Sequence, residues 1–241
     1  MDTATGVWET PGGHRALMSY RPGTSDWNTI SSIMAPHDEY AIPGGALSGW
    51  AADIGAHVGG VAIALALDNP EVRVLAVEPV PQNVELLKRN VEQNGLIERI
   101  VVIPGAIGLR GNVTVWYGYK GSETAEHHAW IGNSSLAYDH AGENEHDETV
   151  YPATTLADLV AMADGYLAWV KIDCEGGEWD ALRSQGIQRI GYITGEYHPV
   201  RGHVRSDLVP LLDATHDLTF PDPPKGVDPE IGPGPFIAVL R

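Results

Sequence analysis

The segment Ala52-Asp53-Ile54-Gly55-Ala56-His57-Val58-Gly59-Gly60 places an acid and a cluster of glycines after a short apolar run. A second apolar run, residues 61–67, follows at once and is long enough to begin a helix. This order is typical of a strand, a tight turn and a helix N-terminus, where free backbone N–H groups can receive part of a ligand. The segment therefore predicts the first strand and ligand-binding turn of an α/β fold.

A second strand, residues 73–78, ends in the acid Glu78. It follows the glycine turn by roughly twenty residues, the spacing at which an acid accepts hydrogen bonds from the hydroxyls of a ribose. Together the two segments predict a cofactor that contains a nucleoside.

The residue at position 57 separates the candidate cofactors. The dinucleotide fingerprint G-x-G-x-x-G needs its second glycine so that the backbone can approach a pyrophosphate, and His57 holds that position here. S-adenosylmethionine has a ribose and no pyrophosphate, so the pattern favours it over NAD. An ordinary glycine-bearing turn that binds nothing remains an alternative at this point.

Composition bounds the class of partner. The chain has 241 residues, 43% of them hydrophobic, which suits a single domain, and its formal charge is −17. Such an acidic chain repels nucleic-acid phosphates and offers no basic face to anionic lipid. We therefore expect a small-molecule partner, neutral or cationic, and no nucleic acid or membrane, although solubility alone also accounts for the charge. The sequence does not indicate an oligomeric state.

Cys174 is the only cysteine, which fits a reducing compartment. The N-terminus shows no basic region followed by an apolar run, and no apolar run is long enough to span a bilayer. We expect a cytoplasmic protein.

From residue 51 the sequence alternates strand and helix patterns, which predicts a mostly parallel sheet with helices on both faces. Strands are expected near 52–54, 73–78, 100–103, 113–117 (an edge strand), 167–172, 192–197, 218–220 and 236–240, the last two as an antiparallel pair. Helices are expected near 61–67, 81–91, 179–182 and 206–215, with another after the capping box Thr155–Asp158.

Two regions depart from this alternation within the single domain 1–241. Residues 1–50 are expected to form a lead-in or cap, with a hairpin and a helix over 26–34 capped by Ser25 or Asp26. The polar insertion 121–148 is either functional or disordered. Its groups His127-His128 and Glu145-His146-Asp147 could bind a metal, but their spacing matches no ordinary zinc site, so a solvated acidic loop is favoured.

Polar groups gather where the predicted strands end. Ligands of open α/β sheets bind beyond the carboxyl ends of the strands. The residues that fall at such ends are Asp53, Glu78, Ala106, Asp173, Glu175, Glu196 and His198. Their convergence favours an enzyme.

Several motifs resemble those of the FkbM-type S-adenosylmethionine-dependent methyltransferases, over about residues 20–200. They are Asp53-Ile54-Gly55-Ala56-x-x-Gly59, Glu78-Pro79-x-x-x-Asn83, Asn90-x-x-x-Asn94-Gly95, Lys171-Ile172-Asp173-Cys174-Glu175-Gly176-x-Glu178, Glu196-x-His198 and the upstream Arg21–Asp26 and Glu39-Tyr40. The chain departs from common patterns of such enzymes at His57, where Asn is frequent, and at Ala106, where an Asp often holds the adenine amine.

The resemblance implies a class I, Rossmann-like methyltransferase fold, with a C-terminal antiparallel strand in the sheet. It also implies O-methylation of a hydroxyl on a sugar, polyketide or similar metabolite of natural-product biosynthesis. The residues expected at the cofactor are Thr24, Ser25, Asp53, Gly55, Ala56, His57, Glu78, Pro79, Asn83, Ala106 and Asp173.

The chemistry implied by the resemblance needs no enzyme nucleophile, because the methyl donor is already an activated sulfonium. Cys174 is therefore interpreted as a packing residue. His198 is the first candidate for a base, with Asp173 and Glu175 orienting it, binding the acceptor or ligating a cation. The acids could instead cap the following helix or pair with Lys171 and Arg183.

A divalent cation at Asp173, Glu196 and His198 is possible, but its absence is favoured at this stage. Two other functions remain open: a non-catalytic S-adenosylmethionine-binding partner protein and, less favoured because of His57, an NAD-dependent oxidoreductase.

Overall fold

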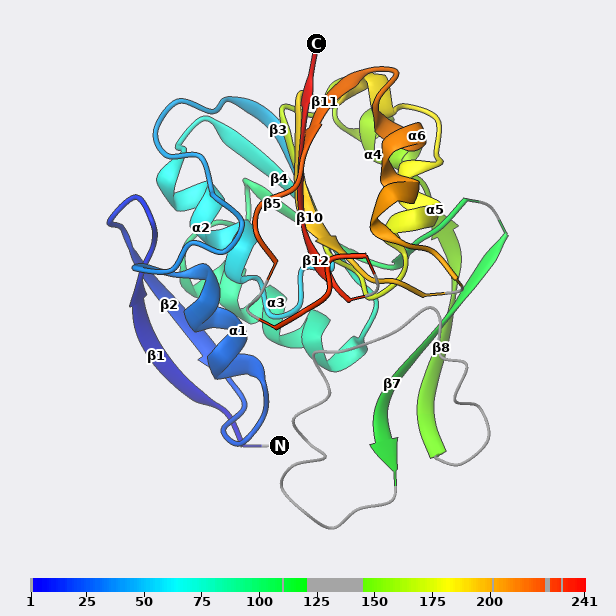
Figure 1. The fold of residues 1–241 in the computed structure, drawn as a ribbon. Coiled ribbons are helices and arrows are strands. Elements are labelled where there is room, and N and C mark those ends of the chain that lie inside the picture. The colour runs from blue at the N-terminus through cyan, green and yellow to red at the C-terminus, as the bar shows by residue number, and fades with distance from the viewer. Residues whose placement is uncertain (1, 110, 121–144, 201, 224–225, 231) are drawn as a thin grey trace.

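The computed structural model describes residues 2–109, 111–120, 145–200, 202–223, 226–230 and 232–241. Within these residues, the main sheet has seven strands in the order β11-β12-β10-β9-β3-β4-β5 (Figure 1). Their bounds are β3 (Gly49–Ile54), β4 (Val72–Glu78), β5 (Ile100–Pro104), β9 (Trp169–Ile172), β10 (Tyr192–Tyr197), β11 (His216–Thr219) and β12 (Gly234–Leu240). All neighbours pair in parallel except β12, which is antiparallel to β10 and β11. The predicted mostly parallel sheet with a C-terminal antiparallel strand is confirmed.

Helices cover both faces of this sheet (Figure 1). One face carries α1 (Asp26–Ile33), α2 (Gly60–Asp68) and α3 (Pro81–Gln93), and the other carries α4 (Leu156–Met162), α5 (Glu178–Leu182) and α6 (Val209–Leu212). Side chains of a strand alternate between the faces, so the core divides in two. Along β4, Val74 and Ala76 pack with α2, while Leu75 and Val77 pack with the cluster on the opposite face.

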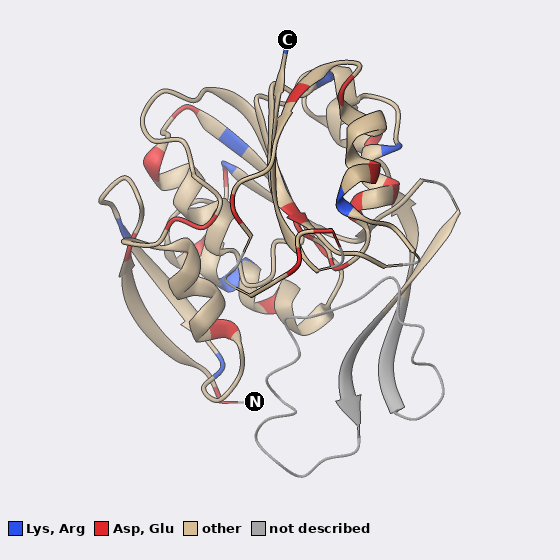
Figure 2. Ribbon diagram, in the orientation of Figure 1, with Lys and Arg blue, Asp and Glu red and all other residues tan. Residues whose placement is uncertain are grey.

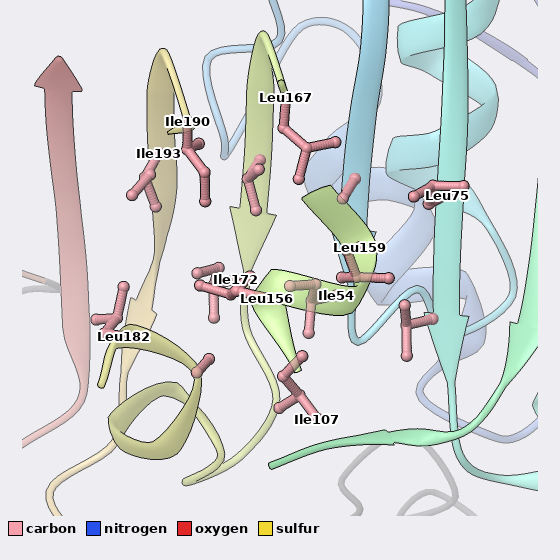
Figure 3. Packing of buried hydrophobic residues seen from close by; sticks show 14 of the residues in the cluster. Ile54, Leu75, Ile107, Leu156, Leu159, Leu167, Ile172, Leu182, Ile190 and Ile193 are labelled. Atoms are coloured by element: carbon pink, nitrogen blue, oxygen red, sulfur yellow. The ribbon is translucent and has the colours of Figure 1, made fainter. Parts of the chain in front are cut away.

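The hydrophobic cluster that contains Leu75 and Val77 lies under α4 and α5. Figure 3 shows Leu156 and Leu159 of α4 gathered with Ile54 and Ile172 of the sheet. Fully burying one such aliphatic side chain contributes about 1.5–3 kcal/mol, so this contact fixes the strand ends from which the cavity described below is built.

Helix boundaries follow the predicted signals closely. Thr155 Oγ1 accepts a hydrogen bond from the Asp158 N–H at 3.1 Å, and Asp158 accepts one from the Thr155 N–H at 2.9 Å, so the predicted capping box is confirmed. The helix α3 begins with Pro81 and is followed by Gly95 in the left-handed region, at φ +69°.

The first fifty residues contain the expected hairpin, β1 (Ala4–Glu9) with β2 (Arg15–Tyr20), and the expected helix α1. The capping prediction is wrong in its chemistry. Ser25 occupies the N-cap position but makes no capping bond, whereas Thr24 Oγ1 accepts from the Asp26 N–H at 3.2 Å. The Asp26 side chain is used elsewhere, as shown below.

Two further predictions, on residues 145–148 and on the helix expected over 206–215, need correction. The edge strand expected over 113–117 is β7 (Asn112–Lys120), which lies at the edge of a separate sheet of order β6-β8-β7. In this sheet β7 is antiparallel to β8 (Glu145–Thr154), and β6 (Ala106–Ile107) is parallel to β8. Residues 145–148, expected in a loop, therefore belong to a strand. The remainder of the insertion, including His127 and His128, lies outside the described residues.

The helix expected over 206–215 is shorter, with a 3₁₀ turn η3 (Arg205–Leu208) ahead of the four-residue α6. Pro210 accounts for the break, because it lacks the N–H that would join the two turns into one α-helix. None of the helices in the described part of the chain has the length and apolar character needed to cross a membrane.

Candidate active site

A cavity of about 550 Å³ opens at the carboxyl ends of β3, β4, β9 and β10. The predicted site residues that line it are Gly55, Ala56, His57, Glu78, Pro79, Ala106, Asp173, Glu175 and His198. Side chains of α1 complete the wall, so the N-terminal lead-in and the sheet share one cavity.

Glu78 is almost fully buried at one end of this cavity, with 3% of its surface exposed. Its Oε1 accepts hydrogen bonds from the Val80 N–H at 2.9 Å and from Asn83 Nδ2 at 3.1 Å. Its Oε2 accepts from the His57 N–H at 2.8 Å. A carboxylate oxygen has about two acceptor sites, so among the described residues Oε2 keeps one for a hydroxyl in the cavity.

The glycine turn brings His57 to that position. His57 adopts φ +50°, in the left-handed region, and its N–H is directed to Glu78. That N–H is consequently not available to a pyrophosphate. Gly55, at φ +80°, allows the turn to touch the neighbouring strand end, since a Cβ there would lie 1.8 Å from the Asp173 carbonyl oxygen.

A buried polar network supports the turn from the side of α1. Arg21 donates to Asp26 through Nε at 2.8 Å and Nη2 at 2.7 Å, and its Nη2 also donates to Asn83 Oδ1 at 2.6 Å. His57 Nε2 lies 3.0 Å from Asp26 Oδ1. Burial would raise the pKa of Asp26, but the contacts with His57 and Arg21 outweigh it and hold that pKa well below its ordinary value.

Four residues predicted at the cofactor do not line the cavity: Thr24, Ser25, Asp53 and Asn83. Three of them, Thr24, Asp53 and Asn83, support the site from outside. Asp53 is fully buried on the α2 side of β3, where it accepts from the Ala62 N–H at 3.0 Å and faces Lys171 at 3.5 Å. Asn83 supports Glu78, and Thr24 caps α1.

Lys171 lines the cavity as well, although the sequence gave it no role beyond its place in the Lys171–Glu178 motif and a possible pairing with the acids. Its ammonium donates to the Ile54 and Gly55 carbonyls at 3.3 and 2.7 Å. Burial would lower the pKa of Lys171, but the carboxylates of Asp53 and Asp173 raise it above its ordinary value. The side chain is therefore a fixed cation beneath the glycine turn.

Tyr40 is a second residue that sequence reasoning left without a role. Its hydroxyl donates to Asp173 Oδ2 at 2.6 Å, across 133 residues of sequence. Burial would raise the pKa of Asp173, but Lys171, His198 and this hydroxyl lower it. Asp173 is therefore an ionised carboxylate that faces the cavity.

His198 and Glu178 require a correction. His198 Nδ1 lies 2.9 Å from Glu178 Oε1, so Glu178 fixes the ring, the role expected of Asp173. Burial would lower the pKa of His198, but Glu178, Glu175 and Asp173 raise it to about 10. At neutral pH the ring is then an imidazolium, and His198 has no lone pair with which to act as a base.

Glu175 and Glu196 complete the acidic end of the cavity. Glu175 Oε2 lies 3.3 Å from His198 Nε2, and Glu196 Oε2 lies 3.8 Å from it. Burial, together with the surrounding carboxylates, raises the pKa of each acid to about 7, against the opposing effect of His198. Around the single imidazolium of His198, this end of the cavity gathers the carboxyl groups of Asp173, Glu175, Glu178 and Glu196.

Cys174 is packed against the apolar cluster under α5. Burial and the neighbouring carboxylates raise the pKa of its thiol well above the ordinary value, so it is a poor nucleophile.

The family of the chain is established by its sequence. Residues 53–220, more than half of the chain, match the methyltransferase FkbM domain, and the chain belongs to that family. It is an S-adenosylmethionine-dependent methyltransferase with the class I fold, whose strand order the sheet reproduces. No curated protein sequence matches the chain.

Solved structures give distant likenesses. A precorrin-6Y C5,15-methyltransferase from Geobacter metallireducens is 15% identical, with 89% of this chain and 86% of that chain covered and a TM-score of 0.45. A structure described as precorrin 8w decarboxylase, from Methanobacterium thermoautotrophicum, is 15% identical, with 91% and 93% covered and a TM-score of 0.48. A structure described as a putative rRNA methylase, from Clostridium thermocellum, is 10% identical, with 90% and 96% covered and a TM-score of 0.49.

Proposed function

We propose that the protein transfers the methyl group of S-adenosylmethionine to a hydroxyl of a small molecule. The acceptor class we propose is a sugar or polyketide-type metabolite of natural-product biosynthesis, modified in the cytoplasm. The observation that carries the proposal is the single cavity that joins Glu78 at one end to Asp173, Glu175 and His198 at the other.

The residues at the Glu78 end fit the adenosyl part of the cofactor. The remaining acceptor site on Glu78 Oε2 suits a ribose hydroxyl, and Val77, Ala106, Ile107 and Val115 line an apolar wall of the same cavity. Flat aromatic groups bind well against such walls. The apolar wall also accounts for the absence of an acid at position 106.

The bound cofactor supplies a methyl group already activated on a sulfonium. The chain's own task is then to hold an acceptor oxygen in line with that methyl group, and such positioning provides much of the rate. Asp173 and Glu175, which line the cavity, would accept a hydrogen bond from an acceptor hydroxyl. The buried thiol of Cys174 has no part in this scheme.

The rival functions differ from this one in their requirements. An NAD-dependent oxidoreductase needs backbone N–H groups for a pyrophosphate, and the His57 N–H is already directed to Glu78. A non-catalytic binding protein would need only the residues that hold the cofactor, yet Asp173, Glu175, Glu196 and His198, at the ends of β9 and β10, line the same cavity.

Calorimetry with S-adenosylhomocysteine and NAD tests the cofactor assignment. We expect S-adenosylhomocysteine to bind and NAD not to bind. Glu78→Gln should weaken S-adenosylhomocysteine binding about 10- to 150-fold, because a hydrogen bond to a charged group contributes roughly 1.5–3 kcal/mol. The matched control is Glu85→Gln on the exposed face of α3, which should bind as the wild type does. Tight NAD binding would overturn the assignment.

The reaction itself is tested with methyl-labelled S-adenosylmethionine and a panel of sugars and polyketide alcohols. A labelled methyl ether, identified by NMR, is the expected product. A protein that binds the cofactor but labels no hydroxyl, while labelling an amine or a carbon acceptor, would contradict O-methylation and leave the methyltransferase assignment intact.

A further inference from the structure

We propose that Asp173, Glu196 and His198 bind one divalent cation of the Mg²⁺ or Mn²⁺ type at the acceptor end of the cavity. Binding of the ion stands on the geometry of these side chains alone. Its use in catalysis rests on the proposed function.

The three side chains offer ligand atoms at the distances that one ion needs. One carboxylate oxygen of each acid and one ring nitrogen of His198 all lie within 4.8 Å of one another. Ligands on opposite sides of Mg²⁺ lie about 4.2 Å apart, because each bond is about 2.1 Å long. Asp173 directly follows β9, Glu196 lies at the end of β10 and His198 directly follows it. Because β9 and β10 pair directly, the three ligand atoms need to move only slightly closer to bind one ion.

The ring of His198 is held as metal-binding histidines usually are. Glu178 is fully buried and its position is fixed, since its Oε1 accepts from the Cys174 N–H at 3.0 Å and its Oε2 from the Gly176 N–H at 2.9 Å. Its Oε1 also contacts His198 Nδ1 at 2.9 Å. A carboxylate on the far ring nitrogen orients the imidazole and leaves Nε2 for the ion. That Nε2 faces the carboxylates of Glu175 and Glu196.

A second histidine nearby, His203, also contacts a carboxylate but is not arranged to bind a cation. Its Nδ1 contacts the carboxylate of Asp207 at 3.2 Å, and its ring stacks on Trp179. Its Nε2, however, lies 3.2 Å from Arg183 Nη2, a cation. Only at His198 does the second nitrogen point to a group of acids, so the two histidines form a matched pair for experiment.

The charge of the site selects the class of ion. Asp173, Glu175 and Glu196 surround His198, while the nearby ammonium of Lys171 is already engaged by backbone carbonyls and by Asp53. Carboxylate oxygens with a single imidazole suit Mg²⁺ and Mn²⁺ better than softer metals. The ion would replace the proton on Nε2, which leaves to solvent.

Such an ion would complete the acceptor site. With three protein ligands it keeps open positions for water or for an acceptor oxygen. The ion would lower the pKa of a hydroxyl bound there, so that its proton could pass to solvent water without a histidine base.

The test is a titration of the protein with Mn²⁺, without cofactor or acceptor, followed by the loss of the electron paramagnetic resonance signal of free Mn²⁺. We expect one Mn²⁺ per chain, displaced by Mg²⁺. Glu196→Gln and His198→Asn should each weaken binding at least tenfold, whereas His203→Asn should bind as the wild type does. Because Glu196 is partly exposed and the substitution to glutamine keeps its shape, that variant remains informative if His198→Asn does not fold.

Absence of Mn²⁺ binding to the wild type, or equal binding by Glu196→Gln, would overturn the proposal. Parallel calorimetry with S-adenosylhomocysteine separates this failure from failure of the proposed function, since it reports the other end of the cavity. If Mn²⁺ does not bind while an amino sugar does, the acidic cluster is a site for a cationic acceptor and the metal proposal is wrong.

Discussion

Asp26 links the N-terminal lead-in to the part of the cavity that Glu78 lines. The residue is completely buried, and it receives the Arg21 backbone N–H at 2.9 Å in addition to the Arg21 side chain and His57. Asn83 extends the same network to Glu78. Glu78 is therefore coupled to Asp26 of α1 through Asn83 and Arg21, by hydrogen bonds alone.

We predict that Asp26→Asn destabilises the protein by about 3–5 kcal/mol at neutral pH, because it leaves the buried guanidinium of Arg21 without its counter-charge. The folded-state pKa of Asp26 is lowered from the ordinary 3.8, so the stability it contributes is present above that value and is lost as the pH falls below it. Thermal melts of the wild type and of Asp26→Asn should be recorded from about pH 7 to about pH 3. The difference between their melting temperatures should become smaller only in acid.

Asp213→Asn is the control, because Asp213 pairs with Arg241 on the surface and 65% of its side chain is exposed. It should leave the midpoint almost unchanged at every pH. A gap between wild type and Asp26→Asn that stays constant into acid would show that the stabilisation does not come from the ionised carboxylate.

For a single residue, the sequence predicts the position along its strand but not the direction in which the side chain points. Glu78 and Asp53 both fall near the carboxyl end of a strand, yet Glu78 faces the cavity and Asp53 faces α2. Side-chain direction alternates along a strand, so one residue's error in the boundary exchanges the two faces. The hydroxyl of Tyr40 on Asp173 has no local signal at all, because the two meet only through the tertiary fold.

Among the elements, α3 holds the N-terminal hairpin through buried and half-buried amide side chains, of which Asn90 is the most buried. Asn90 is fully buried, and its side-chain amide pairs with the backbone of β2 as a neighbouring strand would. It accepts from the Ser19 N–H at 2.7 Å and donates to the Ser19 carbonyl at 3.0 Å. Its amide also donates to the Val58 carbonyl of the glycine turn at 2.8 Å. One side chain thus fixes three elements that meet beside the cavity.

We predict that Asn90→Ala lowers the free energy of unfolding by about 2–5 kcal/mol, since several buried backbone groups lose their partners at roughly 1–3 kcal/mol each. Amide hydrogen exchange should increase in the hairpin before it increases in the central sheet. Glu92→Ala, at an exposed position of the same helix, is the control and should cost much less. Uniform exchange across hairpin and sheet in Asn90→Ala would contradict a specific docking role.

The sequence predicts best those elements in which the spacing of apolar residues corresponds to the face or faces that the element buries. The central strands and α3 lie within a few residues of their expected bounds, because each buries one face or both against its neighbours. The β7–β8 pair was harder to place, since its alternating pattern does not say which sheet it joins. The short α6 shows a local effect, a proline, overriding a helical pattern.

The whole molecule is strongly acidic, with 32 acidic against 15 basic residues. Figure 2 shows acidic positions spread widely over the described ribbon and basic positions at few places. Many of the basic side chains are also engaged, as Arg21 is by Asp26 and Arg241 is by Asp213 and Asp217. The charge distribution therefore differs from that needed to bind a phosphate backbone.

We therefore predict that the protein binds neither RNA nor DNA at about 0.15 M ionic strength, where only close contacts with phosphates survive screening. Fluorescence anisotropy with a labelled structured RNA and with a single strand should show no saturable binding at micromolar protein, with or without S-adenosylhomocysteine. Lowering the salt should not restore binding, because an acidic surface repels the backbone more strongly as screening weakens. Affinity that rises as salt falls would reveal a basic surface on the assembled protein and would make a nucleic acid, rather than a small alcohol, the acceptor to test first.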